Sequence, residues 1–156
     1  RIRAAVDARN EGTDILILAR TDARHEHGLG EAISRAAKFR ELGADILFVE
    51  APKSVDEMRT ICSELPGWQM ANIVEGGETP DLSADELQDI GYVIAAYPLS
   101  LMAAAMRAMT GVLGALRDGD TQARQSMLMD FAELRQRVGF EDYYEQSARY
   151  RSSARD

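Results

Sequence analysis

The stretch Asp45–Val49 (DILFV), followed directly by Glu50, decides the fold class of this chain. Four consecutive apolar residues without alternation are typical of a strand that is covered on both faces, as in a parallel sheet. Three comparable runs lie on either side of it, at Ile15–Ala19, Trp68–Val74 and Tyr92–Tyr97. The sequence therefore predicts four strands of similar length.

Segments with apolar residues at helical spacing alternate with these strands. Helices are expected at about 31–42, 54–65, 83–90, 99–117 and 121–138, after a first helix that ends near residue 10. Ser54 with Glu57 and Ser83 with Glu86 have the spacing of capping boxes. The alternation predicts a parallel sheet with right-handed crossovers, either doubly wound or part of a (β/α)₈ barrel. The tail after Gly139 is expected to fray.

Composition excludes several classes of protein. The 156 residues include 18 basic and 26 acidic side chains, which gives a net charge of −8 and argues against a nucleic-acid partner. No apolar stretch reaches about 18 residues, so no membrane span is expected. The single cysteine, Cys62, excludes a disulfide framework, fits a reducing compartment such as the cytoplasm, and is expected to pack in the core.

Polar side chains of different kinds stand at the carboxyl ends of the four expected strands. They are Arg20 with Asp22, Glu50, Asn72 with Glu75, and Tyr97 with Ser100. Both candidate architectures bind ligands at that edge of the sheet, so these positions form the predicted site. The planar, permanently charged fork of Arg20 suits a substrate carboxylate, but it could also be a surface arginine paired with Asp22.

Glu50 and Asn72 each have more than one possible role. A carboxylate directly after Phe48 and Val49 needs a partner, because an unpaired buried charge is costly. For Glu50, contact with substrate, a place near a metal and structural pairing with Arg20 all remain compatible. Asn72 could contact the same ligand or satisfy backbone groups of its own strand.

Four motifs in order resemble the isocitrate lyase/phosphoenolpyruvate mutase superfamily. They are ILARTDA (17–23), GADILFVEAP (43–52), ANIVEGGETP (71–80) and AAYPLS (95–100), and the likeness continues into GFEDYYEQSARY (139–150). The residues of the last three segments, 71–80, 95–100 and 139–150, are most similar to the branch of carboxyvinyl-carboxyphosphonate phosphorylmutase and the 2-alkylmalate lyases.

The resemblance implies a (β/α)₈ barrel of TIM type, which typically needs about 250 residues. This α/β chain is therefore expected to be the C-terminal half of such a barrel, strands five to eight, with additional C-terminal helices. We expect a half barrel at 1–118, beginning inside the domain, and a helical extension at 119–156. The resemblance also implies a homo-oligomer, a dimer or tetramer with possible exchange of a helix between subunits.

The resemblance further implies a chemistry and a set of site residues. Family members cleave or form C–C or P–C bonds through an enolate stabilised by Mg²⁺, whose ligands are expected in the half of the barrel outside this sequence. By resemblance Arg20 binds a substrate carboxylate and Glu50 lies in the active site. The same comparison implies that Asn72, Ile73 and Val74 contact the ligand and that Pro98 lines the pocket.

The expected activity is cleavage of a small 2-hydroxy or 2-oxo dicarboxylate, a 2-alkylmalate or an oxaloacetate-like acid. Methylisocitrate lyases carry an arginine where Ala103 stands, so a tricarboxylate substrate is disfavoured. Oxaloacetate decarboxylases tend to have a histidine at Pro98, which weakens that alternative, and a phosphonopyruvate-type activity is a further one. The competing hypothesis is a catalytically incomplete half barrel that functions only together with its other half.

Overall fold

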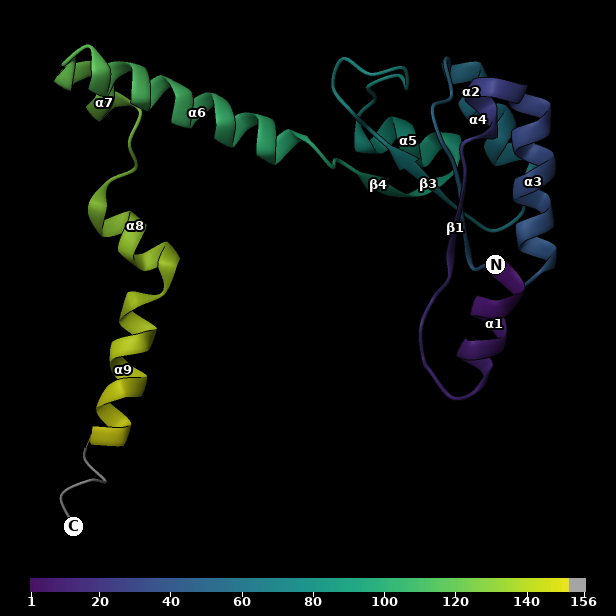
Figure 1. The fold of residues 1–156 in the computed structure, drawn as a ribbon, viewed down its shortest axis with the longest axis horizontal. Helices are drawn as coiled ribbons and strands as arrows, with labels where there is room; N and C mark the ends of the chain where they lie inside the picture. The colour runs from purple at the N-terminus through teal and green to yellow at the C-terminus, as the bar shows by residue number, and fades with distance from the viewer. Residues whose placement is uncertain (152–156) are drawn as a thin grey trace. The chain divides into compact units, whose positions relative to one another are not determined.

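A computed structural model describes residues 1–151 (Figure 1). Its four strands form one parallel sheet in the order β1-β2-β3-β4. They are β1 (Leu18–Thr21), β2 (Ile46–Val49), β3 (Trp68–Asn72) and β4 (Tyr92–Ala96). The α/β class and the parallel sheet that the sequence predicted are therefore confirmed.

Helices connect consecutive strands and continue beyond the last one. They are α1 (Ile2–Asn10), α2 (Ala23–His27), α3 (Leu29–Glu41), α4 (Val55–Glu64), α5 (Ala84–Ile90), α6 (Ser100–Arg117), α7 (Thr121–Ser126), α8 (Phe131–Val138) and α9 (Phe140–Arg151). Within residues 1–151, no helix is both long and apolar enough to cross a membrane.

The chain divides into two compact units, 1–103 and 104 onward. This division falls in the first turn of α6, and the predicted boundary after residue 118 lies just beyond the other end of the same helix. The first unit contains the whole sheet and all the candidate site residues. The second contains most of α6 and the helices α7 to α9.

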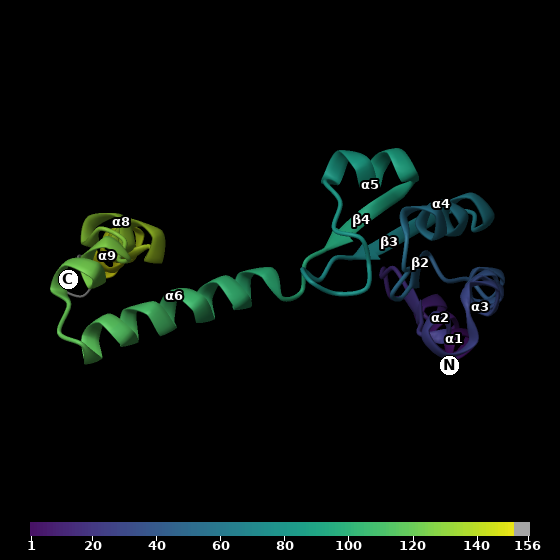
Figure 2. The same cartoon turned by 90° about the horizontal axis from the view of Figure 1, so that it is seen from above.

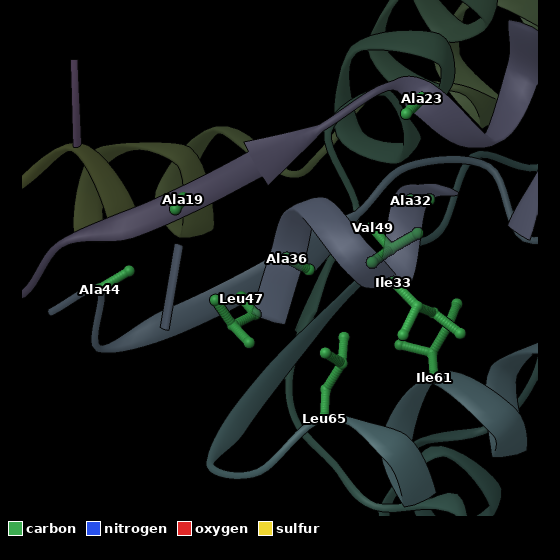
Figure 3. Packing of buried hydrophobic residues seen from close by; sticks show 10 residues of the cluster. All are labelled: Ala19, Ala23, Ala32, Ile33, Ala36, Ala44, Leu47, Val49, Ile61 and Leu65. Carbon is green, nitrogen blue, oxygen red and sulfur yellow. The ribbon is translucent and has the colours of Figure 1, made fainter. Parts of the chain in front are cut away.

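One face of the sheet is covered by helices and forms the core. The helices α3, α4 and α5 lie along the same side of the strands (Figure 2). Leu47 of β2 is fully buried against α3, and Ile33 of α3 and Ile61 of α4 point toward each other in the same cluster (Figure 3). A second cluster includes Ile73, which follows β3 and is also fully buried. Most of the apolar burial that stabilises this unit is therefore on this face.

The opposite face carries the alternate residues of each strand, because side chains point to opposite faces in turn. The register pairs Leu18 with Ile46, Arg20 with Phe48, and Asn72 with Ala96 across neighbouring strands. These residues share the face that α3, α4 and α5 leave uncovered. We call it the open face.

The first strand begins later than the sequence predicted. The expected strand Ile15–Ala19 is wrong at its start, because pairing with β2 begins only at Leu18. The carboxylate of Asp45 accepts a hydrogen bond from the Ile17 amide at 2.7 Å, which satisfies that donor outside the ladder. Ile15 remains 57% exposed, so its apolar character does not reflect burial in the sheet of this unit.

Two predictions in the C-terminal part are corrected. The single helix expected over 121–138 is broken into α7 and α8, because the Asp130 side chain caps a new helix by accepting from the Ala132 amide at 2.8 Å. Gly139 ends α8 in the left-handed conformation at φ 82°. The tail after it forms α9 up to residue 151 instead of fraying, and the rest of the predicted frayed tail, 152–156, lies outside the described residues.

Candidate functional site

The candidate site lies at the carboxyl edge of the sheet, where the four parallel strands end together. Backbone bonds continue the ladder past the strands at this edge: the Glu50 amide donates to the Thr21 carbonyl at 3.0 Å, and the Ile73 amide donates to the Ala96 carbonyl at 2.8 Å. The first residues beyond the strands are therefore held in order. They are the positions from which ligand contacts are made in such folds.

Arg20 projects from β1 on the open face, with its guanidinium carbon 5.0 Å from the centre of the Phe48 ring. Its Nε and Nη2 donate to Asp22 Oδ1 at 3.0 and 2.7 Å, and Nη2 lies 3.5 Å from Glu50 Oε2. The hydrogen bond that Arg20 donates to Asp22, followed by the charge of Glu50, raises the pKa of Arg20 against the effect of burial. The pairing of Arg20 with Asp22 is thus observed, and its role in binding a substrate carboxylate stays a prediction.

Glu50 is the most enclosed carboxylate of the site, with a side chain that is 25% exposed. Its Oε2 is buried and accepts no hydrogen bond, although the Arg20 guanidinium is close enough for an ion pair. A buried acceptor without a donor is costly, and the charge of the Arg20 guanidinium 3.5 Å away compensates for part of that cost. The next residue, Ala51, has φ 56°, a left-handed conformation that costs energy for a residue other than glycine.

A cavity of about 580 Å³ adjoins this pair. Its lining includes Arg20, Asp22, Glu50, Ala51 and Glu78, together with residues of α2 and α3. Ligand pockets for small molecules typically fall between about 300 and 1,000 Å³, so a small dicarboxylate would fit. The predicted residues Arg20 and Glu50 are therefore brought together at one cavity.

The other four predicted site residues do not line this cavity. Asn72 ends β3 on the open face, in register with Ala96. The side chain of Ile73 is fully buried in the core beside Met58 and Leu87, so only its backbone is near the strand edge. Val74 is half-buried and Pro98 is exposed. Their roles toward a ligand remain predictions.

A further polar contact joins the ends of β3 and β4. The hydroxyl of Ser100, the first residue of α6, donates to the carboxylate of Glu75, and this bond lowers the pKa of Glu75. Both residues are among the predicted strand-end positions. Ala51 and Glu78 were not predicted as cavity residues, although the loop EGGETP, which contains Glu78, indicates an irregular segment at this edge of the sheet.

The described residues do not by themselves fit a magnesium site. Mg²⁺ prefers near-octahedral oxygen ligands. Across residues 1–151 no group of three or more His, Cys, Asp or Glu side chains is placed to hold a metal ion. Glu50 offers one free carboxylate oxygen, but it lies beside the positive charge of Arg20. The expectation that the metal ligands lie outside this sequence therefore stays a prediction.

Comparison with known proteins identifies relatives over most of the chain. The chain is 40% identical to 2,3-dimethylmalate lyase of Eubacterium barkeri, over 96% of this chain and 52% of that protein. It is 35% identical to the petal death protein of Dianthus caryophyllus, over 97% of this chain and 48% of that protein. The chain therefore spans about half the length of the curated relatives that it matches.

Solved structures also include relatives that match most of this chain and about half of their own length. Oxaloacetate acetylhydrolase in complex with 3,3-difluorooxalacetate superposes with a TM-score of 0.85 and 29% identity, over 94% of this chain and 50% of that one. Phosphonopyruvate hydrolase in complex with oxalate and Mg²⁺ superposes with a TM-score of 0.78 and 26% identity, over 96% and 53%. This coverage agrees with the predicted fold, half of a barrel of this superfamily.

The family model of phosphoenolpyruvate phosphomutase matches residues 1–117, which include all four strands and the Arg20–Glu50 pair. A solved relative, 2,3-dimethylmalate lyase, is itself described as a PEP mutase/isocitrate lyase superfamily member. The chain belongs to the phosphoenolpyruvate phosphomutase family, within the PEP mutase/isocitrate lyase superfamily.

Proposed function

We propose that the protein carrying this segment is a carbon–carbon lyase or a related hydrolase. Its substrate would be a small 2-hydroxy or 2-oxo dicarboxylate of the 2-alkylmalate or oxaloacetate type. The observation that carries the proposal is the Arg20–Glu50 pair at the cavity, with the guanidinium turned to the open face and a buried carboxylate oxygen unbonded. The names of the relatives, a dimethylmalate lyase and an oxaloacetate acetylhydrolase, agree with this substrate class.

In this proposal Arg20 binds one carboxylate of the substrate. Its Nε and Nη2 are engaged by Asp22, which fixes the plane of the guanidinium, and Nη1 is left to donate to a ligand. The positive charge also stabilises negative charge that develops on the bound acid. Glu50, which lines the same cavity, lies beside the guanidinium and would orient it toward the ligand. Asn72, on the same face, would help to position the ligand.

The remaining parts of the proposal concern the whole protein. Mg²⁺ would be held by residues outside this sequence, and one solved relative, phosphonopyruvate hydrolase, is in complex with oxalate and Mg²⁺. We also propose a homo-oligomer, a dimer or tetramer with possible helix exchange, in the cytoplasm. A small carboxylate is the proposed partner, with neither nucleic acid nor membrane involved.

The decisive experiment is a turnover assay with the full-length protein. The purified protein with Mg²⁺ would be offered 2,3-dimethylmalate, other 2-alkylmalates, oxaloacetate and phosphonopyruvate, and release of keto acid or oxalate would be measured. We expect turnover of at least one alkylmalate or of oxaloacetate, abolished by EDTA. If none of these acids is turned over, the proposal is wrong. If only phosphonopyruvate is turned over, the protein cleaves P–C bonds and not C–C bonds.

A second candidate function follows from the open face of the sheet. Parallel sheets are normally covered on both faces, yet here Trp68 is 51% and Ile94 37% exposed. These exposures favour a segment that acts only when joined to the other half of the barrel. Co-expression of this segment with the matching N-terminal half of a relative tests this: activity should need both polypeptides. Activity of the segment alone would overturn it.

A further inference from the structure

We propose that Arg24 and Glu57 form a positioning pair that holds together the segments following β1 and β2, next to Arg20 and Glu50. The inference rests on the proposed function for its catalytic readout. Arg24 lies on α2, which follows β1, and Glu57 lies in the first turn of α4, which follows β2. The pair therefore joins the segment after Arg20 to the segment after Glu50.

The contact between these side chains is bidentate and partly buried. Arg24 Nε donates to Glu57 Oε2 at 2.9 Å, and Nη2 donates to Oε1 at 2.6 Å. The two side chains are only 15% and 22% exposed. Bidentate geometry with low exposure separates this pair from the solvent-exposed ion pairs of the molecule, which typically contribute little.

A capping box was predicted at Ser54 and Glu57, but the Glu57 carboxylate does not complete it. The Ser54 hydroxyl accepts from the Glu57 amide at 3.1 Å, which is half of the box. The Glu57 carboxylate does not return to the Ser54 amide. It accepts instead from the Lys53 amide at 2.8 Å, one residue earlier, while binding Arg24. One carboxylate thus fixes both the turn after Glu50 and the helix after Arg20.

A weaker contact extends the connection to the next loop. Lys53 Nζ lies 3.8 Å from Glu78 Oε2, and Glu78 lines the cavity from the loop after β3. The loops after β1, β2 and β3 are therefore joined through alternating charges. The central contact is Arg24–Glu57, since the Lys53–Glu78 pair is about half exposed on both sides.

This arrangement acts on the site through geometry and not through contact with substrate. Neither Arg24 nor Glu57 lines the cavity. The Glu57 bond to the Lys53 amide fixes the turn that begins at Ala51, whose left-handed backbone sets the direction of Glu50. A displacement of about 1 Å in a catalytic group can cost about 100-fold in rate. Loss of the pair should therefore reduce turnover while leaving the chemical groups in place.

The test uses the full-length protein with Arg24→Gln, Glu57→Gln and the double variant. Arg137→Gln is the control, because Arg137 also binds a glutamate, Glu133, but with a side chain that is 66% exposed. We expect each single variant to lower kcat about tenfold with little change in KM, and the double variant to be no worse than either single one. The control should change kcat less than twofold, and Arg24→Lys should recover part of the loss.

Hydrogen exchange provides a readout that does not depend on activity. In Arg24→Gln, the amides of Glu50, Ala51, Lys53 and Ser54 should exchange several-fold faster, although the substitution is on α2. Unchanged exchange there, or additive losses of kcat in the double variant, would overturn the positioning role. If the wild-type protein turns over none of the acids, the proposed function fails by itself, and the exchange result still decides whether the two loops are coupled.

Discussion

The two faces of the sheet differ in burial and in the polar residues they carry, although the same strands build both. On the helix-covered face the side chains of Ala19, Leu47 and Ala71 are almost fully buried. On the open face Arg20 is about half exposed and Asn72 is half-buried. Moving one residue along a strand changes a core position into a site position, because the side-chain period is two.

We therefore expect the covered face to determine stability and the open face to determine ligand binding and catalysis. Substitutions on the covered face should change the free energy of unfolding, and those on the open face should change ligand binding and turnover. Variants on each face test that separation.

Leu47→Ala should produce the largest loss of stability. Leu47 is fully buried in the cluster between the sheet and α3, so truncation leaves a cavity that costs about 2–5 kcal/mol in unfolding free energy. Leu16→Ala is the matched control, because Leu16 is 58% exposed in the segment before β1, and it should change stability by less than about 0.5 kcal/mol. Urea denaturation of both variants measures their unfolding free energies. Equal denaturation midpoints would contradict the expected difference between the buried and the exposed position.

Arg20→Ala should affect ligand binding and leave stability nearly intact. Removal of a guanidinium that binds a carboxylate typically costs about 3 kcal/mol, or about 100-fold in kcat/KM or in affinity for oxalate. Calorimetry with oxalate and Mg²⁺ measures the affinity, and thermal denaturation checks the fold.

The control for this substitution is Arg117→Ala, which removes an exposed arginine that also binds an aspartate, Asp118, at 2.7 Å. Oxalate should bind that variant as it binds the wild type. If Arg20→Ala unfolded the protein instead, the open face would be structural and the separation of the two faces would be wrong.

Ser83→Ala should have a smaller effect, confined to stability. Ser83 and Glu86 form a complete capping box at the start of α5, a helix on the covered side. Loss of such a cap costs about 1 kcal/mol. The midpoint of chemical denaturation should fall accordingly while KM stays constant, so a change in KM would show that α5 influences the open face.

Cys62 should react slowly with thiol reagents in the folded protein. Burial raises the pKa of its thiol to about 11, although a hydrogen bond with Tyr92 acts in the opposite direction. A raised pKa favours the neutral thiol, so at pH 8 only about one molecule in a thousand carries the reactive thiolate. Labelling with iodoacetamide should accelerate about tenfold per pH unit up to that pKa, and rapid labelling at pH 8 would place Cys62 outside the core.

Much of the fold was predictable because parallel strands that pack between layers are nearly continuous apolar runs. The run at 45–49 was placed to within one residue, since β2 has neighbours on both sides. The run at 15–19 was misplaced because β1 is an edge strand here, and only pairing with β2 decides where it begins. Apolar residues alone do not reveal which part of a run finds a partner.

Site residues could be predicted where the neighbouring sequence marks them, and could not be predicted where their position depends on residues distant in the sequence. Arg20 and Glu50 follow apolar runs directly, and the structure brings them within 3.5 Å. Asn72 and Ile73 are adjacent in sequence, but the register places them on opposite faces, which the sequence did not separate. The pairing of Arg24 with Glu57 joins residues 33 positions apart, and no short motif marks such a contact.

The backbone at Ala51 has a consequence for the folding of the turn that carries Glu50. A glycine would adopt φ 56° without strain, but it would also give the unfolded chain many more conformations to lose. Alanine followed by Pro52 restricts the unfolded chain on both sides of that bond, so less conformational entropy is lost when the turn forms. Because the residue before a proline prefers extended backbone, this narrower ensemble does not favour φ 56°, and contacts of the folded turn, such as the bond from the Lys53 amide to Glu57, must hold Ala51 in its strained conformation.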